Sequence, residues 1–191
     1  MRIIGGSAGG VILGVPKGFD VRPTPDLVRQ AIFNSLGDRV IDSKVVEFFA
    51  GTGALSLECL SRGATAAVCV ELSNHHAGFI RKNVVAARLS PAAMDIRVQD
   101  TFTAIHQMAQ GGQQFDLIFA DPPYGEKNVG KRSGSFAQQM LDSVDLPKIL
   151  TADGLFILGH TKRDTLTFPD YWEEKKMLKH GDTVIRFLRK P

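Results

Sequence analysis

Short apolar runs and longer amphipathic segments alternate along most of this chain. Apolar runs of strand length occupy residues 44–49, 66–71, 94–100 and 115–121. Helical patterns begin between them at Ala54, Asn74 and Thr103, and Ser73 is a suitable N-cap for the second. Because strands that alternate with helices form parallel sheets covered on both faces, the pattern predicts an α/β fold.

The two ends of the chain depart from this alternation. Residues 2–4 and 11–13 are short apolar runs separated by glycines, which predicts a β-hairpin ahead of the main domain. Near the other end, residues 154–159 predict a further strand, and residues 171–178 and 183–188 predict a terminal antiparallel pair. We therefore expect an N-terminal hairpin arm over residues 1–20 and one domain over residues 21–191.

The amino-acid composition excludes few classes of protein. The 191 residues carry a formal net charge of +3, which permits a nucleic-acid partner without requiring one. Neither a signal peptide nor a long apolar stretch is evident, so we expect a cytoplasmic protein. The five histidines and two cysteines lack metal-ligand spacing, so no metal is expected, and Cys59 and Cys69 are interpreted as buried apolar residues.

A glycine-containing loop follows the first strand of the alternating region. Gly51 and Gly53 would let the backbone approach a ligand closely, and Glu47 precedes them on the strand. Ser56 stands where a phosphate-binding loop would carry its third glycine, and the Walker lysine is missing. The loop therefore favours a cofactor held by its nucleoside and amino-acid parts, with Glu47 available to an ammonium group.

Acidic residues close the next two strands. Glu71 ends residues 66–71, where a carboxylate can accept both hydroxyls of a ribose. Asp100 ends the following run and could accept from an adenine amino group. Any one of these acids could instead be a solvated loop charge or a helix cap. Together they predict the cofactor-binding residues Glu47, Ala50, Gly51, Gly53, Glu71, Leu72, Asp100 and Thr101.

The tetrapeptide Asp121-Pro122-Pro123-Tyr124 follows the fourth strand, at an edge where ligands bind in open α/β sheets. Two prolines remove two backbone donors, so the segment is rich in acceptors, and Tyr124 adds a flat face. These features suit a planar group that bears an NH2. The tetrapeptide resembles the signature of S-adenosylmethionine-dependent amino methyltransferases, although a stiff turn after a strand is the alternative.

Nearly the whole chain resembles the RsmD family, which methylates a guanine N2 amine in 16S ribosomal RNA of the small subunit. The segments that carry the resemblance are Arg2-Ile3-Ile4-Gly5-Gly6, Arg22-Pro23-Thr24, Arg29, Phe33-Asn34, Phe49 to Leu55, Glu58, Ser61 to Ala64, Glu71, Asp121 to Tyr124, and Gly181-Asp182-Thr183. The chain departs from the family at Ala8-Gly9-Gly10, where a basic residue is usual, and at Gln30, where an acid is common. Both departures lie near the expected RNA contacts rather than the cofactor motifs.

The resemblance implies a Rossmann-like class I methyltransferase fold with a mostly parallel seven-stranded sheet and an antiparallel terminal strand. It also implies S-adenosyl-L-methionine as cofactor and small-subunit ribosomal RNA, free or in the subunit, as partner. The sequence leaves the oligomeric state open, and a monomer is the default expectation. The expected catalytic residues are Asp121, Pro122, Pro123 and Tyr124. The expected substrate-binding residues are Arg2, Arg22, Arg29, Lys127, Lys131 and Arg132.

Other functions remain open at this point. Surface charge and helix pairing would equally explain the arginines, and residues 125–135 could be a connection with no role. An amino methyltransferase acting on adenine N6 or a protein glutamine is one alternative, although that class often carries asparagine in place of Asp121. A small-molecule methyltransferase is another. A non-catalytic ribosome-assembly protein with a vestigial cofactor fold is the alternative from a different class.

Overall fold

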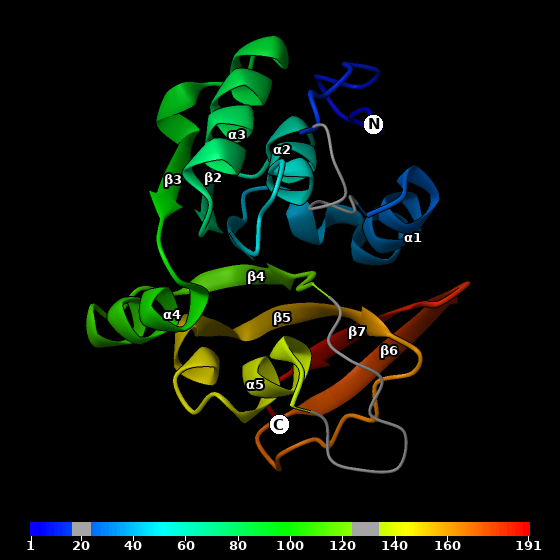
Figure 1. Ribbon diagram of the computed structural model, residues 1–191, viewed down its shortest axis with the longest axis vertical. Helices are drawn as coiled ribbons and strands as arrows, with labels where there is room; N and C mark the ends of the chain where they lie inside the picture. The colour runs from blue at the N-terminus through cyan, green and yellow to red at the C-terminus, as the bar shows by residue number, and fades with distance from the viewer. Residues whose placement is uncertain (17–23, 124–133) are drawn as a thin grey trace. The chain divides into compact units, whose positions relative to one another are not determined.

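The computed structural model describes residues 1–16, 24–123 and 134–191 (Figure 1). Its contacts divide the chain into two compact units, Met1–Thr101 and Phe102–Pro191. In the parts of the chain that are described, no helix has both the length and the apolar character needed to cross a bilayer.

The first unit is built on three parallel strands: β1 (Lys44–Phe48), β2 (Ala66–Glu71) and β3 (Met94–Val98). β2 lies between the other two, with Val46 paired to Val68 in one ladder and Cys69 paired to Ile96 in the other. β1 is buried from Val45 onward, as expected for a strand covered on both faces. The strands begin where the apolar runs predicted and end one or two residues earlier at β1 and β3.

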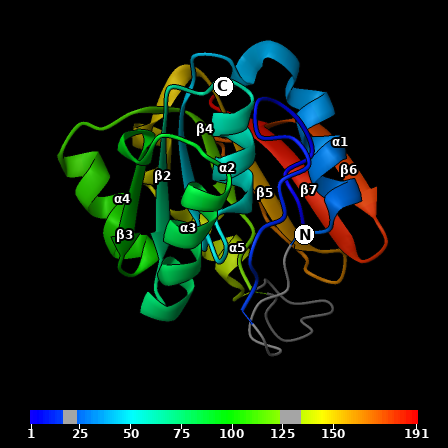
Figure 2. The same cartoon turned by 90° about the horizontal axis from the view of Figure 1, so that it is seen from above.

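Helices follow each of these strands. α2 (Ala54–Ser61) packs on β1 and β2, and α3 (Asn74–Ala86) packs on β2 and β3. Both cover the same face of the three strands (Figure 2). Every residue of α2 is buried, and the predicted Ser73 cap of α3 is confirmed, since its hydroxyl accepts from the His76 N–H. The remaining helical elements of this unit are α1 (Asp26–Leu36), η1 (Gly37–Val40) and η2 (Pro91–Ala93).

The N-terminal residues form the expected antiparallel pairing and are fastened to α2. The Ile3 N–H donates to the Val11 carbonyl at 2.9 Å, and Arg2 and Ile12 form an antiparallel bridge. The fully buried Glu58 carboxylate accepts from the N–H groups of Ile4 and Gly5 at 2.8 and 2.9 Å. The boundary expected at residue 20 lies outside the described residues and stays a prediction.

The second unit contains four strands in the order β4-β5-β7-β6. β4 and β5 are parallel, whereas β7 is antiparallel to both β5 and β6, which confirms the predicted terminal pair. The elements are α4 (Thr101–Gln110, whose first residue belongs to the first unit), β4 (Phe115–Ala120), α5 (Phe136–Asp142), η3 (Leu146–Ile149), β5 (Leu150–Thr161), β6 (Glu173–His180) and β7 (Thr183–Arg189).

The second unit departs most clearly from the sequence prediction at α4, β5 and α5. α4 begins two residues before the expected Thr103, and β5 starts at Leu150 rather than at Gly154. α5 was not predicted, because its seven residues are too few to show a helical period. Its start is nevertheless defined by Ser135, whose hydroxyl accepts from the Gln138 N–H.

Glu58→Ala should destabilise the first unit and loosen the arm. The change leaves two backbone N–H groups without their acceptor and removes the partner of Arg62, whose Nε donates to Glu58 at 2.8 Å. We expect the free energy of unfolding to fall by about 3 kcal/mol in a denaturant titration, because buried hydrogen bonds to a charge are lost.

The control is Asp95→Ala, which removes the carboxylate from an exposed pair with Arg97 and should change stability by less than about 0.5 kcal/mol. Limited proteolysis should cleave the arm faster in the Glu58 variant than in the control. Equal stability of the two variants would show that Glu58 does not fasten the arm.

Candidate functional site

The glycine loop between β1 and α2 is held in a left-handed conformation. Phe49, Gly51 and Gly53 have φ values of 55°, 54° and 71°. A Cβ atom on Gly53 would lie 2.9 Å from Ile80 Cγ2, so that position has neither the space nor the backbone conformation for a side chain. The Ala50 N–H donates to the Val70 carbonyl at 3.1 Å, which ties the loop to the end of β2.

Glu47, near the end of β1, accepts hydrogen bonds from backbone N–H groups in the first turn of α2. Its Oε2 accepts from the Ser56 N–H at 2.8 Å, and its Oε1 from the Leu55 N–H at 3.4 Å. Burial raises the pKa of this carboxyl group to about 7, against the hydrogen bonds, which lower it. Both oxygens of Glu47 therefore accept from backbone N–H groups at the start of α2. Binding of an ammonium group by Glu47 stays a prediction.

Glu71 connects the end of β2 to the same loop. Its Oε2 accepts from the Gly51 N–H at 2.7 Å, and its Oε1 accepts from the Ser73 N–H at 2.8 Å. His76 Nδ1 also lies 3.4 Å from Oε1, so Oε2 has the more available second lone pair, through which Glu71 can still accept from a ligand's hydroxyl group. The next residue, Leu72, is 72% exposed, which places an apolar surface beside that carboxylate.

Asp100 and Thr101 follow β3 at the corresponding edge. Glu71 pairs with Val98 in the β2–β3 ladder, and the Gln99 N–H donates to the Glu71 carbonyl at 3.2 Å. Asp100 is exposed and Thr101 is buried at the start of α4. The eight predicted cofactor residues thus lie in one unit, in or just after the carboxyl ends of three parallel strands.

These residues fit a nucleoside-containing cofactor without phosphates. The loop offers a tight backbone surface, Glu71 offers free acceptor capacity, and exposed Leu72 offers an apolar contact for a ring. A carboxylate at the end of β2 also matches the place where open α/β folds bind a ribose.

Asn83 is a residue of this region that the sequence interpretation missed. Its side chain is buried in α3, accepts from the Gly14 N–H at 2.7 Å, and donates to the carbonyls of Gly14 and Thr52, each at 3.1 Å. It therefore joins the arm to the glycine loop. A polar residue on the apolar face of the predicted helix was the available signal.

The acceptor-rich segment lies in the second unit, directly after β4. Asp121 is half-buried, Pro122 is buried and Pro123 is exposed. Ala120, the last residue of β4, pairs with Leu158 of β5, so the next step of the parallel register brings Asp121 beside Gly159. Tyr124, the fourth residue of the motif, lies outside the described residues.

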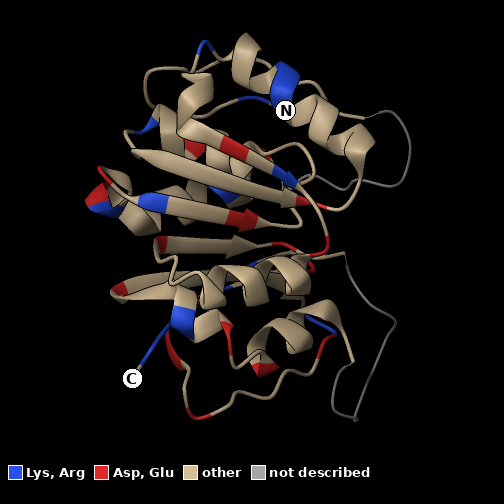
Figure 3. Cartoon of the chain, turned by 90° about the vertical axis from the view of Figure 1, so that its left-hand side faces the viewer, with Lys and Arg blue, Asp and Glu red and all other residues tan. Residues whose placement is uncertain are grey.

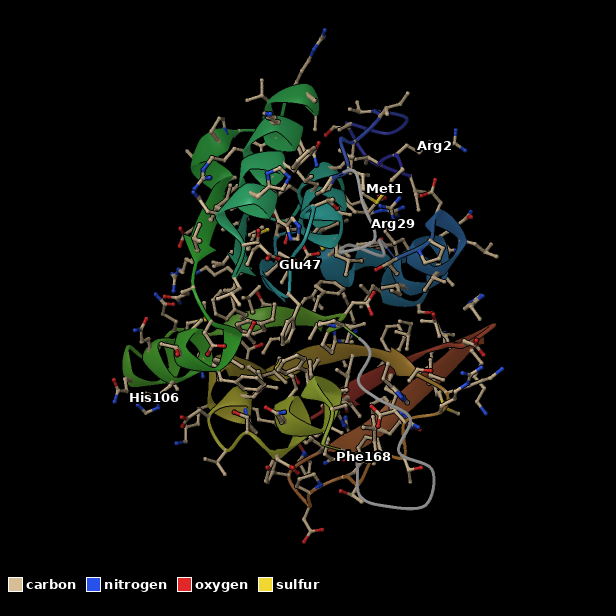
Figure 4. All side chains as sticks on the ribbon, in the orientation of Figure 1. Met1, Arg2, Arg29, Glu47, His106 and Phe168 are labelled. Atoms are coloured by element: carbon tan, nitrogen blue, oxygen red, sulfur yellow. The ribbon has the colours of Figure 1, made fainter. Side chains whose placement is uncertain are left out.

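The predicted substrate-binding arginines have different environments. The side chain of Arg2 is 69% exposed, whereas that of Arg29 is completely buried beneath the arm (Figure 4). Arg29 Nη2 donates to the Arg2 carbonyl and to Asp26 Oδ1, the latter at 2.8 Å. The expectation that Arg29 meets RNA at the surface is therefore wrong, since its guanidinium connects α1 to the arm.

The other predicted substrate residues, Arg22, Lys127, Lys131 and Arg132, fall outside the described residues. Basic and acidic residues are interspersed among the elements on the side drawn in Figure 3. Within the ranges that the structure describes, no three His, Cys, Asp or Glu residues gather as a metal site. Cys59 and Cys69 are free and buried, as expected, and burial raises the pKa of both thiols.

Known proteins resemble this chain over nearly its full length. A family model described as "Conserved hypothetical protein 95" matches residues 1–189. Ribosomal RNA small subunit methyltransferase D of Haemophilus influenzae is 33% identical over 185 residues, which are 97% of this chain and 90% of that protein. The protein of the same name from Escherichia coli is 37% identical over 124 residues, which are 65% of this chain and 60% of that protein.

The fold of the chain is also found among solved structures. The Escherichia coli protein yhhF superposes with a TM-score of 0.81 at 26% identity and covers all of this chain and 97% of its own. Together with the α/β elements described above, this likeness confirms the predicted fold class.

Glu47 should make stability depend on pH. Its carboxyl group has a pKa of about 7 in the folded protein and of about 4.5 in the unfolded chain, so folding is favoured when Glu47 is protonated. That contribution is complete below about pH 4.5 and is lost as the pH rises through 7. Between these values we expect wild-type stability to fall by about 3 kcal/mol more than that of Glu47→Gln, at about 1.4 kcal/mol per pKa unit.

The measurement is urea unfolding of both proteins at successive pH values. Groups that titrate in both proteins, such as His160, cancel in the difference. Parallel pH profiles would show that the pKa of Glu47 is not raised in the folded state.

Proposed function

The chain belongs to the RsmD family, and from this premise we propose that it transfers a methyl group from S-adenosyl-L-methionine to the N2 amine of a guanine in small-subunit ribosomal RNA. The observation that carries the proposal is an acceptor-rich segment, Asp121-Pro122-Pro123, placed directly after a strand of an α/β sheet in a member of this family. The acceptor character of the segment is what an amine with two N–H bonds requires.

The first unit is proposed to hold the cofactor. Glu71 would accept the ribose hydroxyls, Asp100 the adenine amine, and Leu72 would contact the adenine ring. The loop that contains Ala50, Gly51 and Gly53 would lie against the methionine part, with Thr101 beside the adenosine. When bound, S-adenosyl-L-methionine supplies an electrophilic methyl group on a positively charged sulfur.

Asp121 and Pro122 are proposed to orient the substrate amine. The lone pair of the guanine N2 is delocalised into the ring, which makes the amine a poor nucleophile. If the Asp121 carboxylate and the Pro122 carbonyl each accept one N–H, the amine is fixed and its lone pair is turned out of the ring plane. Orientation of this kind supplies much of the acceleration in a displacement reaction. Asp121 would then take up the proton released from the amine.

The remaining motif residues would complete the substrate site. Pro123 stiffens the chain after the two acceptors because its ring fixes φ. Tyr124 is proposed to stack on an unpaired or flipped guanine, and base–aromatic stacking contributes about 1–3 kcal/mol per base. The arm over residues 1–20, through Arg2, and the residues Arg22, Lys127, Lys131 and Arg132 would contact RNA phosphates.

The small net charge of +3 favours a folded ribonucleoprotein target over long free RNA. We propose that the enzyme acts as a cytoplasmic monomer on the small ribosomal subunit, where protein and RNA structure already present the target base.

Transfer of labelled methyl groups tests this function directly. The protein should label unmodified small ribosomal subunits from S-adenosyl-L-methionine, and nucleoside digestion should yield N2-methylguanosine. Subunits that already carry the modification are the matched control and should accept little label. Label in N6-methyladenosine or in protein would refute the proposed target, and absence of transfer with intact cofactor binding would refute the proposed substrate class.

Asp121→Ala should separate turnover from cofactor binding. Loss of the carboxylate removes one acceptor for the amine, so we expect kcat to fall by roughly 10³-fold. Affinity for S-adenosyl-L-methionine, measured by calorimetry, should change less than about threefold, because the cofactor residues lie in the first unit.

The control is Asp116→Ala, which removes a carboxylate from the opposite end of β4, where Asp116 accepts from Thr151. Its turnover should stay within about threefold of wild type. Loss of cofactor binding in the Asp121 variant would contradict the assignment of roles.

A further inference from the structure

Gly159 lies in β5 beside the end of β4, directly after a run of four large apolar residues. Its neighbours Ile157 and Leu158 and the preceding Phe156 are buried and fill the core of the second unit. A glycine in such a strand forfeits packing and costs backbone entropy relative to alanine. Its presence among these residues therefore calls for a local physical reason.

The space above Gly159 is occupied by the carboxyl group of Asp121. A Cβ atom added at position 159 would lie 2.4 Å from Asp121 Oδ1, 3.0 Å from Cγ and 3.4 Å from Cβ. The first of these distances is far below van der Waals contact, so a side chain and the present Asp121 rotamer exclude each other. Gly159 has no positive φ that would require glycine on conformational grounds.

The strand register explains why these two residues meet. Ala120 and Leu158 are the last pair of the parallel ladder, so Asp121 and Gly159 occupy the next position along the two chains. Side chains of paired residues in parallel strands point to the same side of the sheet. The Asp121 carboxyl group therefore lies next to the Gly159 Cα, where β5 has no side chain.

We propose that Gly159 is a positioning residue for the reaction, because its missing side chain allows the Asp121 carboxylate to take the orientation in which it accepts the substrate amine. The inference rests on the proposed function and adds a determinant of amine orientation to that site. Any side chain at position 159 would drive the Asp121 carboxylate to another rotamer without removing it. A shift of about 1 Å in a group that orients a substrate can cost about 100-fold in rate.

The test is Gly159→Ala, assayed for methyl transfer to small ribosomal subunits and for cofactor binding. We expect kcat to fall by about 10- to 100-fold while the affinity for S-adenosyl-L-methionine changes less than about threefold. Gly154→Ala is the matched control on the same strand. Its added Cβ would lie 2.6 Å from Leu150 Cδ1 and 2.9 Å from Thr151 Oγ1, so it is equally crowded but away from Asp121.

The Gly154 variant should keep kcat within about threefold of wild type. A Gly159 variant with wild-type kcat would overturn the proposal. Equal losses of kcat in the two glycine variants would also overturn it, because crowding of β5 alone would then explain the effect.

A double-variant cycle separates positioning from general damage to the strand. If the contact is with Asp121, thermal stability lost in Gly159→Ala should be recovered when Asp121→Ala is added, since the clashing carboxyl group is gone. This readout also covers the case in which Gly159→Ala does not fold, because the double variant should then fold. A double variant as unstable as Gly159→Ala would show that Asp121 is not what excludes the side chain.

The same set of variants distinguishes failure of this inference from failure of the proposed function. If Asp121→Ala keeps full turnover, the catalytic assignment is wrong even where the stability cycle shows coupling between positions 121 and 159. If Asp121→Ala loses turnover and Gly159→Ala does not, the catalytic assignment stands and the positioning role of Gly159 is wrong.

Discussion

Two carboxylates hold the glycine loop on which the first unit depends. Glu71 accepts from Gly51 inside the loop, and Glu47 accepts from Leu55 and Ser56 where the loop becomes α2. Gly51 and Gly53 adopt their left-handed conformations without steric cost, whereas the positive φ of Phe49 is unfavourable for an unsupported chain. The carboxylate acceptors within the loop and at the start of α2 offset that cost and stabilise the shape of the loop.

Helices α2 and α3, which lie next to the glycine loop, also bind the N-terminal arm. Glu58 in α2 accepts from the arm backbone, and Asn83 in α3 contacts Gly14 on one side and Thr52 of the loop on the other. Residues far apart in sequence thus share hydrogen bonds around one buried amide. A displacement of the arm at Gly14 would have to break or bend bonds that also position Thr52, which couples the arm physically to the glycine loop.

Strand positions were predictable because the strands appear as short segments rich in apolar residues, and the four predicted segments all became strands. Once these segments were assigned to strands, the positions of the polar residues at their carboxyl ends were predictable as well. The hydrogen-bond partners of individual side chains were harder to predict from the sequence. Arg29 looks like a surface cation in sequence, and only the packing of the arm over α1 buries it. For Glu47, the sequence did not show that its oxygens accept from the first turn of a helix eight and nine residues later. Such pairings depend on tertiary geometry that periodicity does not contain.

The proposed amine site selects by offering acceptors and withholding donors. Pro122 and Pro123 have no backbone N–H, so after Asp121 the chain supplies carbonyl groups to a bound amine and no competing donor from these two residues. The shape of the site also depends on a missing group. The Asp121 carboxylate can keep its orientation next to Gly159 only because that residue has no side chain. An amine with two N–H bonds satisfies two acceptors at once, whereas a hydroxyl or carbonyl group leaves at least one of them unpaired and desolvated. In the proposed site, selectivity for an unmethylated exocyclic amine would therefore come from the donors that these residues lack as much as from the carboxylate that they provide.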